Sequence, residues 1–209
     1  MIPKKIHQVW IGPKKMPVEW MRTWKDKNPS FEYILWDTKK IDGLLLQMQG
    51  KYDYFVNREE YHGAADIVRV EILERYGGVY VDADSACMEP IENTFFMNTD
   101  FFAVRDYRNN ITNGVIGSVP GHPILKDYIQ KIKAVDNRKT KPIWYTIGGQ
   151  LFTSCIKKYI NQHKDGKDKQ WAILPVCSFY PTNYDGQKAR VISKIYAEQF
   201  WGTTNNLYE

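Results

Sequence analysis

The hydrophobic positions of this 209-residue chain change repeatedly between a short apolar pattern typical of strands and a 3.6-residue pattern typical of helices. Apolar runs bounded by Gly, Pro or polar residues predict strands over residues 5–11, 33–36, 79–81, 101–105, 114–119, 144–149 and 172–175. Amphipathic runs predict helices over residues 17–27, 39–49, 59–76 and 124–135, and one more that ends near residue 160. The alternation of strands and helices predicts an α/β protein.

Residues 77–84 (GGVYVDAD) carry the clearest chemical signal in the chain. A Gly pair ends the predicted helix, a short apolar strand follows, and Asp82 and Asp84 then stand at positions i and i+2, where both carboxylates can face one side. Two oxygen donors at the end of a buried strand suit Mg²⁺ or Mn²⁺ with a bound diphosphate. An Asp-x-Asp triplet alone is often only a solvated turn or a helix cap, but ligand sites of open α/β sheets lie at strand carboxyl ends.

A second polar pair lies on the predicted helix over residues 59–76. Asp66 and Arg69 stand at i and i+3, so they project from the same side of that helix. One interpretation is a surface ion pair with little effect on stability. The other is a carboxylate that accepts sugar hydroxyls beside a guanidinium that orients it or meets a phosphate. The helix runs directly into the strand before Asp82, which favours the second interpretation.

Length and composition are those of one globular unit. With 43% apolar residues the chain can bury a single core, so a single domain over residues 1–209 is expected.

Three separated cysteines and four scattered histidines favour neither a disulfide framework nor a zinc site, which disfavours a zinc hydrolase. Residues 1–5 precede a strand rather than an apolar signal core, and no run is long enough to span a membrane, so a cytoplasmic location is expected.

Charge and aromatic residues are distributed unevenly. Residues 126–198 carry 14 Lys and Arg against 6 Asp and Glu, which suggests either peripheral contact with anionic lipid or a solvated basic face. The chain has no recognisable nucleic-acid reader motif, so no nucleic-acid partner is expected. Seven Trp and fourteen Tyr suit the binding of sugar or base faces, and residues 201–204 are expected to fold back over a pocket.

These motifs together resemble glycosyltransferase family 32, the DXD-containing sugar-binding-region enzymes that include mannosyltransferases and capsular polysaccharide transferases. The resemblance spans nearly the whole chain. It rests on residues 2–12 (IPKKIHQVWIG), on Ala65-Asp66-x-x-Arg69 followed by residues 76–84 (YGGVYVDAD), and on Asn113-Gly114 and Gly121-His122-Pro123. What the resemblance implies is a GT-A fold, which is a Rossmann-like α/β fold with a central, mostly parallel sheet flanked by helices.

The resemblance also implies a nucleotide-sugar donor, with UDP favoured, a Mn²⁺ or Mg²⁺ cofactor, and transfer that retains the anomeric configuration. Trp10 would stack on the nucleobase, and Val9 would line the same pocket through its backbone. Asp84 would bind the metal, with Asp82 beside it.

Other positions are assigned by the same resemblance to the sugar side of the donor. Asp66 and Arg69 would contact the donor sugar, and Tyr80 and Asp82 would contact the ribose and the sugar. Asn113 would lie near the transferred sugar and the acceptor. The candidate catalytic residues are Asp66, Arg69, Asp82 and Asp84.

The expected function is therefore metal-dependent, retaining transfer of a hexose to a glycan or lipid-linked acceptor in bacterial capsular or surface polysaccharide synthesis. The chain departs from the family pattern near its C-terminus, where residues 196–204 lack a His that helps to complete the site. Gln199 or Glu198 would replace that His, and Gly148-Gly149 stands where the family has Gly-Pro. The alternative is a weak or inactive homologue that binds nucleotide sugars or glycans. A metal phosphohydrolase ranks last. Its Asp-x-Asp triplet would follow the first strand, whereas Asp82 and Asp84 follow the third predicted strand.

Overall fold

The described part of the chain forms a six-stranded sheet with the strand order β2-β1-β3-β6-β5-β7. The structure is a computed structural model that describes residues 1–136, 142–163, 170–202 and 204–208. The strands of this sheet are β1 (Lys5–Trp10), β2 (Glu32–Asp37), β3 (Gly78–Val81), β5 (Phe101–Arg105), β6 (Ile111–Ser118) and β7 (Trp171–Leu174). Strand β6 runs antiparallel to β3 and β5, whereas β1–β2, β1–β3 and β5–β7 pair in parallel.

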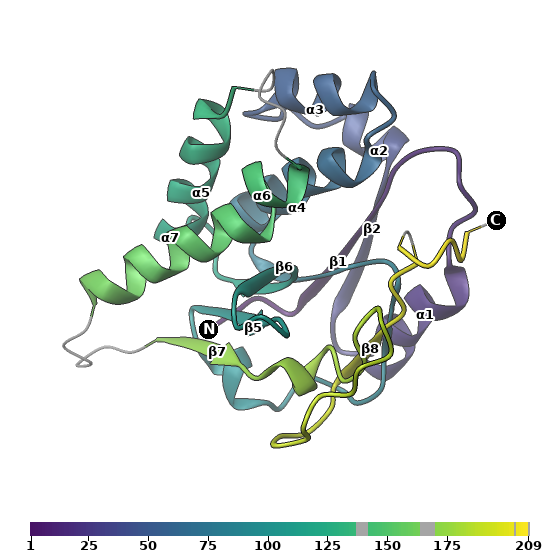
Figure 1. The fold of residues 1–209 in the computed structure, drawn as a ribbon, viewed down its shortest axis with the longest axis vertical. Helices are drawn as coiled ribbons and strands as arrows, with labels where there is room; N and C mark the ends of the chain where they lie inside the picture. Colours follow the sequence, from purple (N-terminus) through teal and green to yellow (C-terminus); the bar gives the residue numbers. More distant parts are fainter. Residues whose placement is uncertain (137–141, 164–169, 203, 209) are drawn as a thin grey trace.

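Helices cover both faces of the sheet (Figure 1). One face carries α2 (Thr38–Asp42), α3 (Gln49–Val56), α4 (Tyr61–Tyr76), α5 (Pro123–Ala134), α6 (Ile143–Thr146) and α7 (Gly149–Gln162). The other face carries α1 (Val18–Lys27) and the short 3₁₀ helices η1 (Phe95–Asn98) and η2 (Val176–Ser178). Among the described helices, none combines the length and the apolar character needed to cross a lipid bilayer.

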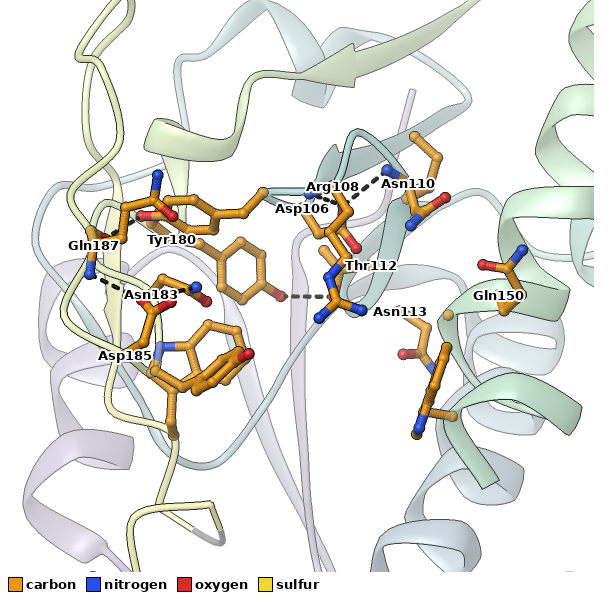
Figure 2. A pocket seen from close by; sticks show the side chains of 16 residues that line it. Asp106, Arg108, Asn110, Thr112, Asn113, Gln150, Tyr180, Asn183, Asp185 and Gln187 are labelled. Carbon is orange, nitrogen blue, oxygen red and sulfur yellow. Dashed lines mark hydrogen bonds between the residues drawn. The ribbon is translucent and has the colours of Figure 1, made fainter. Parts of the chain in front are cut away.

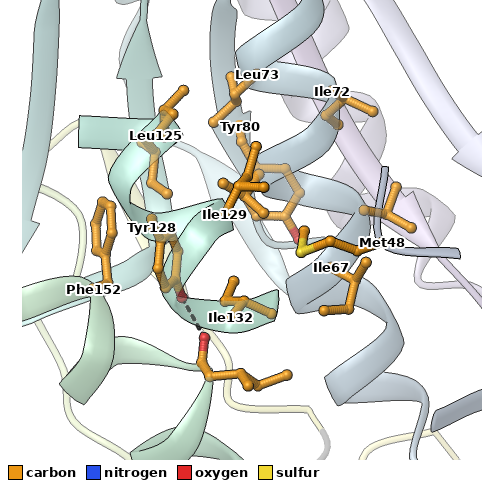
Figure 3. Close-up of a cluster of buried hydrophobic side chains, with 14 of the residues drawn as sticks. Met48, Ile67, Ile72, Leu73, Tyr80, Leu125, Tyr128, Ile129, Ile132 and Phe152 are labelled. Carbon is orange, nitrogen blue, oxygen red and sulfur yellow. Dashed lines mark hydrogen bonds between the residues drawn. The ribbon is translucent and has the colours of Figure 1, made fainter. Parts of the chain in front are cut away.

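Successive strand residues bury their side chains on opposite faces, as the two-residue period of a strand requires. On β3, Tyr80 packs among the helices around α4, whereas Val79 and Val81 pack toward α1. Figure 3 shows the helical side, where residues of α4, α5 and α7 surround Tyr80 and Tyr128. The Tyr128 hydroxyl donates to the carbonyl of Ile147 at 2.5 Å, which ties α5 to the turn before α7.

The topology brings three chain segments to one edge of the sheet. Strands β1 and β3 are parallel neighbours, so their carboxyl ends, at Trp10 and before Asp82, meet at the same edge. Strand β6 pairs antiparallel with β3, with Val115 opposite Val81, so its first residues begin where β3 ends. Asn113 therefore lies beside Asp82 although 31 positions separate them in the chain. Gly77 and Gly78, with φ of +60° and +103°, make the tight turn from α4 into β3.

Two predicted elements differ from the structure. Residues 144–149 were expected to form a strand, but Pro142 starts the helical turn α6, and the amide of Ile147 bonds back to Ile143. The single helix expected over residues 39–49 is wrong, because α2 ends at Gly43 and α3 starts only at Gln49. Between them the chain is held by the amide of Met48, which donates to Glu71 of α4 at 2.7 Å.

A two-stranded sheet was not predicted. It pairs β4 (Ser85–Cys87) with β8 (Ala197–Gln199), which are 110 positions apart in the chain and only three residues long each. Residues 137–141 and 164–169, which belong to the basic stretch over residues 126–198, lie outside the described residues.

His7 of β1 is buried where β1, β2 and the end of α4 pack together. Its Nδ1 accepts a hydrogen bond from the indole of Trp36 at 3.1 Å, so its Nε2 carries the proton and donates to the carbonyl of Gly77 at 2.8 Å. Burial lowers the pKa of His7 to about 4, and charged neighbours such as Lys5 and Glu32 act on it more weakly. The neutral imidazole is thus a structural link rather than a metal ligand.

This burial predicts a measurable pH dependence of stability. An unfolded His titrates near pH 6.5, so the contribution of His7 is fully present above that pH and is lost as the pH falls toward 4. By pH 5 the loss amounts to about 2 kcal/mol. We expect His7→Gln to be less stable than the wild type at pH 7, with a deficit that shrinks by about this amount at pH 5. Urea unfolding of the wild type and the variant at pH 7 and pH 5 measures this difference in the free energy of unfolding. An equal deficit at the two pH values would contradict the prediction.

Candidate active site

A cavity of about 370 Å³ lies at the edge where β1 and β3 end. We call it the aspartate cavity, because Asp82 and Asp84 both line it. The remaining lining residues are Val9, Trp10, Ile11, Lys14, Glu59, Tyr61, His62, Ala65, Arg69, Tyr80, Ala83 and Tyr208. The wall thus combines aromatic surface with three carboxylates and two permanent cations, which suits a ligand that has both a flat ring and charged groups.

Arg69 is the centre of the polar network behind this cavity. Its Nη2 lies 3.2 Å from Asp66 Oδ1 and 3.1 Å from Asp82 Oδ1, and its Nη1 donates to the carbonyl of Asn113 at 2.7 Å. The guanidinium also lies 4.5 Å from the ring centre of Tyr80, whose hydroxyl donates to Asp82 Oδ1 at 2.9 Å. The surface ion pair is therefore the wrong interpretation of Asp66 and Arg69, since both residues are more than 90% buried.

Burial and charge set the protonation of this network. Burial raises the pKa of Asp66 to about 6, against the opposing attraction of Arg69. Burial lowers the pKa of Arg69, but the nearby groups Asp82, Tyr80 and Asp66 raise it more strongly, so the pKa lies above its usual value. Arg69 thus stays cationic and is shared between two carboxylates, which leaves the cluster with an excess of negative charge at neutral pH.

The C-terminal part of the chain folds onto Asp84. Strand β8 pairs with β4 directly after the Asp-x-Asp triplet, so Gln199 lies opposite Ser85. Gln199 Nε2 donates to Asp84 Oδ1 at 2.5 Å, and the amide of Gly202 donates to Asp84 Oδ2 at 2.8 Å. The tail was expected to fold back over a pocket, and these contacts together with Tyr208 in the cavity wall confirm that for its described residues.

The oxygen atoms around Asp84 suit a hard divalent cation. Burial raises the pKa of Asp84 to about 6, and the charge of Asp82 adds to the shift. Gln199 is 5% exposed, and its Oε1 is buried without a hydrogen-bond partner among the described residues. A carboxylate beside another negative charge and an unpaired amide oxygen are both good ligands for Mg²⁺ or Mn²⁺. No cluster of three or more His, Cys, Asp or Glu occurs in the described part of the chain, so a diphosphate and water would complete the coordination.

A neighbouring cavity of about 450 Å³ lies on the other side of the start of β6 (Figure 2). We call it the aromatic cavity, because its wall contains Tyr107, Trp144, Tyr180, Tyr184 and Trp201. Gly114 separates the two cavities: a Cβ atom there would lie 2.4 Å from Asp82 Oδ2 and 2.6 Å from the Tyr180 hydroxyl. Only glycine allows these two groups to approach each other so closely.

The structure places the predicted donor-binding residues in two groups. Val9, Trp10, Arg69, Tyr80, Asp82 and Asp84 all line the aspartate cavity. Asn113 lines the aromatic cavity instead, and its Nδ2 donates to Asp66 Oδ1 at 2.8 Å. Asp66 is not among the residues described as lining either cavity, so it acts here by holding Arg69 and Asn113, and its contact with a sugar stays a prediction.

Some lining residues were not predicted from the sequence. Lys14, Tyr61 and His62 reach the aspartate cavity from the loop after β1 and from the first turn of α4. Tyr208 comes from the tail, where its ring centre lies 5.0 Å from that of Trp10 in an edge-on arrangement. The aromatic tail residues were the available signal, but the sequence could not say which ring enters the cavity.

Comparison with protein families agrees with this geometry. Residues 17–102 match the family model described as a glycosyltransferase sugar-binding region containing a DXD motif, and residues 60–175 match the model of capsular polysaccharide synthesis proteins. The chain belongs to the DXD-containing glycosyltransferases of family 32. Asp82 and Asp84 are the acidic residues of the DXD triplet in this chain.

Related sequences occur in eukaryotes and viruses. An uncharacterized glycosyltransferase of Acanthamoeba polyphaga mimivirus is 31% identical over 76% of this chain and 66% of its own length. A mannosyl phosphorylinositol ceramide synthase of Saccharomyces cerevisiae is 29% identical over 79% of this chain and 46% of its own length. The chain thus spans between about half and two thirds of the length of these two relatives.

Solved structures identify the fold as GT-A. The PaToxG glycosyltransferase superposes with a TM-score of 0.65 at 19% identity, over 77% of this chain and 70% of that one. The UDP-bound glycosyltransferase domain of the YGT toxin superposes with a TM-score of 0.56 at 10% identity, over 82% and 79% of the two chains. The predicted α/β fold with a mostly parallel central sheet is confirmed.

The buried position of Arg69 predicts a large effect of its removal on stability. Arg69→Met keeps a long side chain but leaves Asp66 and Asp82 without their cation, so we expect a loss of about 3–5 kcal/mol. Arg22→Met is the matched control, because Arg22 pairs with Asp26 on the exposed surface of α1 and its removal costs about 0.3–0.5 kcal/mol. Denaturant unfolding of the two variants compares them, and equal losses would show that the Arg69 network does not stabilise the fold.

Proposed function

We propose that this glycosyltransferase is a metal-dependent, retaining enzyme that moves a hexose from a UDP-sugar to a glycan or lipid-linked acceptor in surface polysaccharide synthesis. The supporting observation is the convergence of Asp82, Asp84 and Arg69 on a cavity that Trp10 borders. Such a wall offers a ring surface for a base, cations for phosphates, and carboxylates for a metal. The capsular family model and the mannosyl transfer in the names of relatives support the same class of reaction.

The residues divide into binding and charge-stabilising roles. The indole of Trp10 borders the cavity and donates through Nε1 to the carbonyl of Lys14, which fixes the plane of the ring beside the space for a base. Arg69 and Lys14 place positive charge on the same cavity. Asp84 and Gln199, with Asp82 beside them, would hold a divalent cation, whose chemical contribution is to neutralise the charge of the departing diphosphate.

Catalysis in this arrangement would be mainly electrostatic. Cleavage of the sugar–diphosphate bond develops negative charge on the leaving group, and fixed cations in a partly closed cavity stabilise that charge without reorganisation. No side chain has to act as nucleophile in such a reaction. Asp66 and Asp82 are both paired with Arg69, so neither is a free base, and a phosphate oxygen of the donor would take the proton of the acceptor hydroxyl.

The first test is donor turnover. A panel of UDP-, GDP- and dTDP-sugars with Mn²⁺ should release nucleoside diphosphate from one donor, and Asp84→Ala should lower that release by about 100-fold or more. Asp84→Asn should lower it as well, although it keeps an oxygen that can accept from the Gly202 amide. Asp26→Ala, at an exposed position on α1, is the control that should retain activity.

Metal binding gives a readout that does not depend on turnover. Electron paramagnetic resonance of Mn²⁺ with UDP should show loss of the free-ion signal with the wild type and its recovery with either Asp84 variant. Normal turnover in Asp84→Ala would refute the metal assignment. No release from any donor, together with intact UDP and Mn²⁺ binding, would support the alternative of a binding protein that has lost catalysis.

The role of Trp10 predicts a specific loss of nucleotide affinity. Removing an aromatic surface that stacks on a base costs about 1–3 kcal/mol, so Trp10→Ala should weaken UDP binding by about 5- to 150-fold. Trp20→Ala is the matched control, because Trp20 stacks on Phe200 at 4.3 Å outside the aspartate cavity. Calorimetric titration with UDP measures both, and unchanged affinity in Trp10→Ala would rule out the base-stacking role.

A further inference from the structure

The aromatic cavity lies where an acceptor would have to approach the donor. Asn113 and Thr112 of β6 form part of its wall, and the Tyr180 hydroxyl lies 3.3 Å from Thr112 Oγ1. Tyr180 and Asp82 lie on either side of Gly114, so one glycine backbone separates this cavity from the aspartate cavity. Figure 2 shows Asn183 and Asp185 on one side of the space and Asn113 and Gln150 on the other.

The wall of this cavity is held in place by its own contacts. The Tyr107 hydroxyl lies 2.9–3.1 Å from the carbonyls of Tyr180, Pro181 and Gln187, which fixes the loop after η2. The Trp201 indole donates to the carbonyl of Thr182 at 3.0 Å, and its ring packs against that of Tyr180. The cavity is therefore a built feature of the fold rather than a gap between unconnected loops.

Two of the aromatic rings that line this cavity are exposed to solvent. Trp144 is 57% exposed and Tyr184 is 49% exposed, although both belong to the cavity wall. Large rings left in solvent at a concave site are suited to stack on the apolar face of a ligand. A pyranose ring offers such a face together with hydroxyl groups at its rim.

The polar groups of the wall are suited to hydroxyls rather than to phosphate. Amide side chains of Asn110, Gln150, Asn183 and Gln187 offer donors and acceptors together, as sugar hydroxyls require. Charged residues of the wall are Asp106, Arg108 and Asp185, so the lining carries a net charge of −1, which repels a phosphorylated headgroup.

Asp106 and Asp185 each use one carboxylate oxygen to stabilise the turn in which they stand. Asp106 Oδ1 accepts from the amides of Arg108 and Asn110, and Asp185 Oδ1 accepts from Asn183 and Gln187. The Oδ2 atoms of Asp106 and Asp185 have no hydrogen-bond partner among the described residues. Each is available to accept from a ligand hydroxyl.

We propose that the aromatic cavity binds the acceptor as an uncharged saccharide, whose ring stacks on Trp144 and Tyr184. This proposal rests on the proposed transferase function and names its acceptor class. In the transfer, the acceptor hydroxyl oxygen bonds to the anomeric carbon while the bond between the anomeric carbon and the phosphate oxygen of the donor breaks. The nucleoside diphosphate leaves with the bonding electron pair and takes up the proton of the acceptor hydroxyl.

Saturation-transfer nuclear magnetic resonance tests this binding directly. The probes are methyl glycosides of glucose, galactose, mannose and N-acetylglucosamine, with disaccharides of the same sugars and with myo-inositol 1-phosphate as the charged competitor. The protein is first saturated with UDP and Mn²⁺, so that no sugar enters the aspartate cavity. We expect signal from at least one uncharged saccharide, and a loss of affinity of about tenfold in Trp144→Ala and in Tyr184→Ala.

Tyr145→Ala is the matched control, because Tyr145 is the 42% exposed chain neighbour of Trp144 and is absent from the described cavity wall. It should bind saccharides as the wild type does. UDP titration reports on the other cavity and shows whether the Trp144 variant is folded. The proposal is overturned if no uncharged saccharide binds, if binding survives both aromatic substitutions, or if myo-inositol 1-phosphate displaces the saccharides.

The two proposals fail in different ways. Saccharide binding needs no turnover, so a protein that binds saccharides through Trp144 but releases no nucleoside diphosphate would contradict only the proposed function. Donor turnover that depends on Asp84, with no saccharide bound in the aromatic cavity, would contradict only the acceptor assignment.

Discussion

The buried guanidinium of Arg69 is the interaction on which the candidate site depends. One cation reaches Asp66 on its own helix, Asp82 at the end of β3 and the carbonyl of Asn113 on β6. It therefore ties α4 to two neighbouring strands at the edge of the sheet where the cavities meet. Moving this charge out of water is costly, and only the simultaneous contacts to carboxylates and a carbonyl offset that cost.

The single positive charge of Arg69 does not neutralise all the carboxylates at this site, and in the described part of the chain Asp84 is left without a cation beside it. Arg69 pairs with two carboxylates, those of Asp66 and Asp82, and Asp84 lies beside this pair. Burial, together with the charge of Asp82, raises the pKa of Asp66 and that of Asp84 to about 6. Asp84 has no cationic partner among the described residues, and its carboxylate accepts hydrogen bonds from the neutral donors Gln199 and Gly202. The site thus carries an excess of negative charge, which suits the divalent cation of the proposed function.

Much of the fold was predictable because its long elements carry clear periodicity. The helix α4, the strand β3 and the DXD triplet follow one another directly in the chain, and the Gly pair between α4 and β3 marks the change from helix to strand. Strands β4 and β8 were missed because three residues carry no periodicity, and only tertiary contact pairs them. The turn α6 was mistaken for a strand because Trp144 and Tyr145 favour strands, whereas Pro142 fixes the local backbone for a helical start.

The parts of the site that sequence analysis could not locate are the long-range ones, and they share a physical cause. The segment after β8 touches both cavities: Trp201 borders the aromatic cavity, Gly202 bonds Asp84, and Tyr208 borders the aspartate cavity. No local pattern indicates that Gly202 bonds Asp84 or that Tyr208 packs against Trp10, because these partners lie more than 100 positions earlier. The same tail segment thus contributes to both walls, which agrees with the proposed transfer between a donor in one cavity and an acceptor in the other.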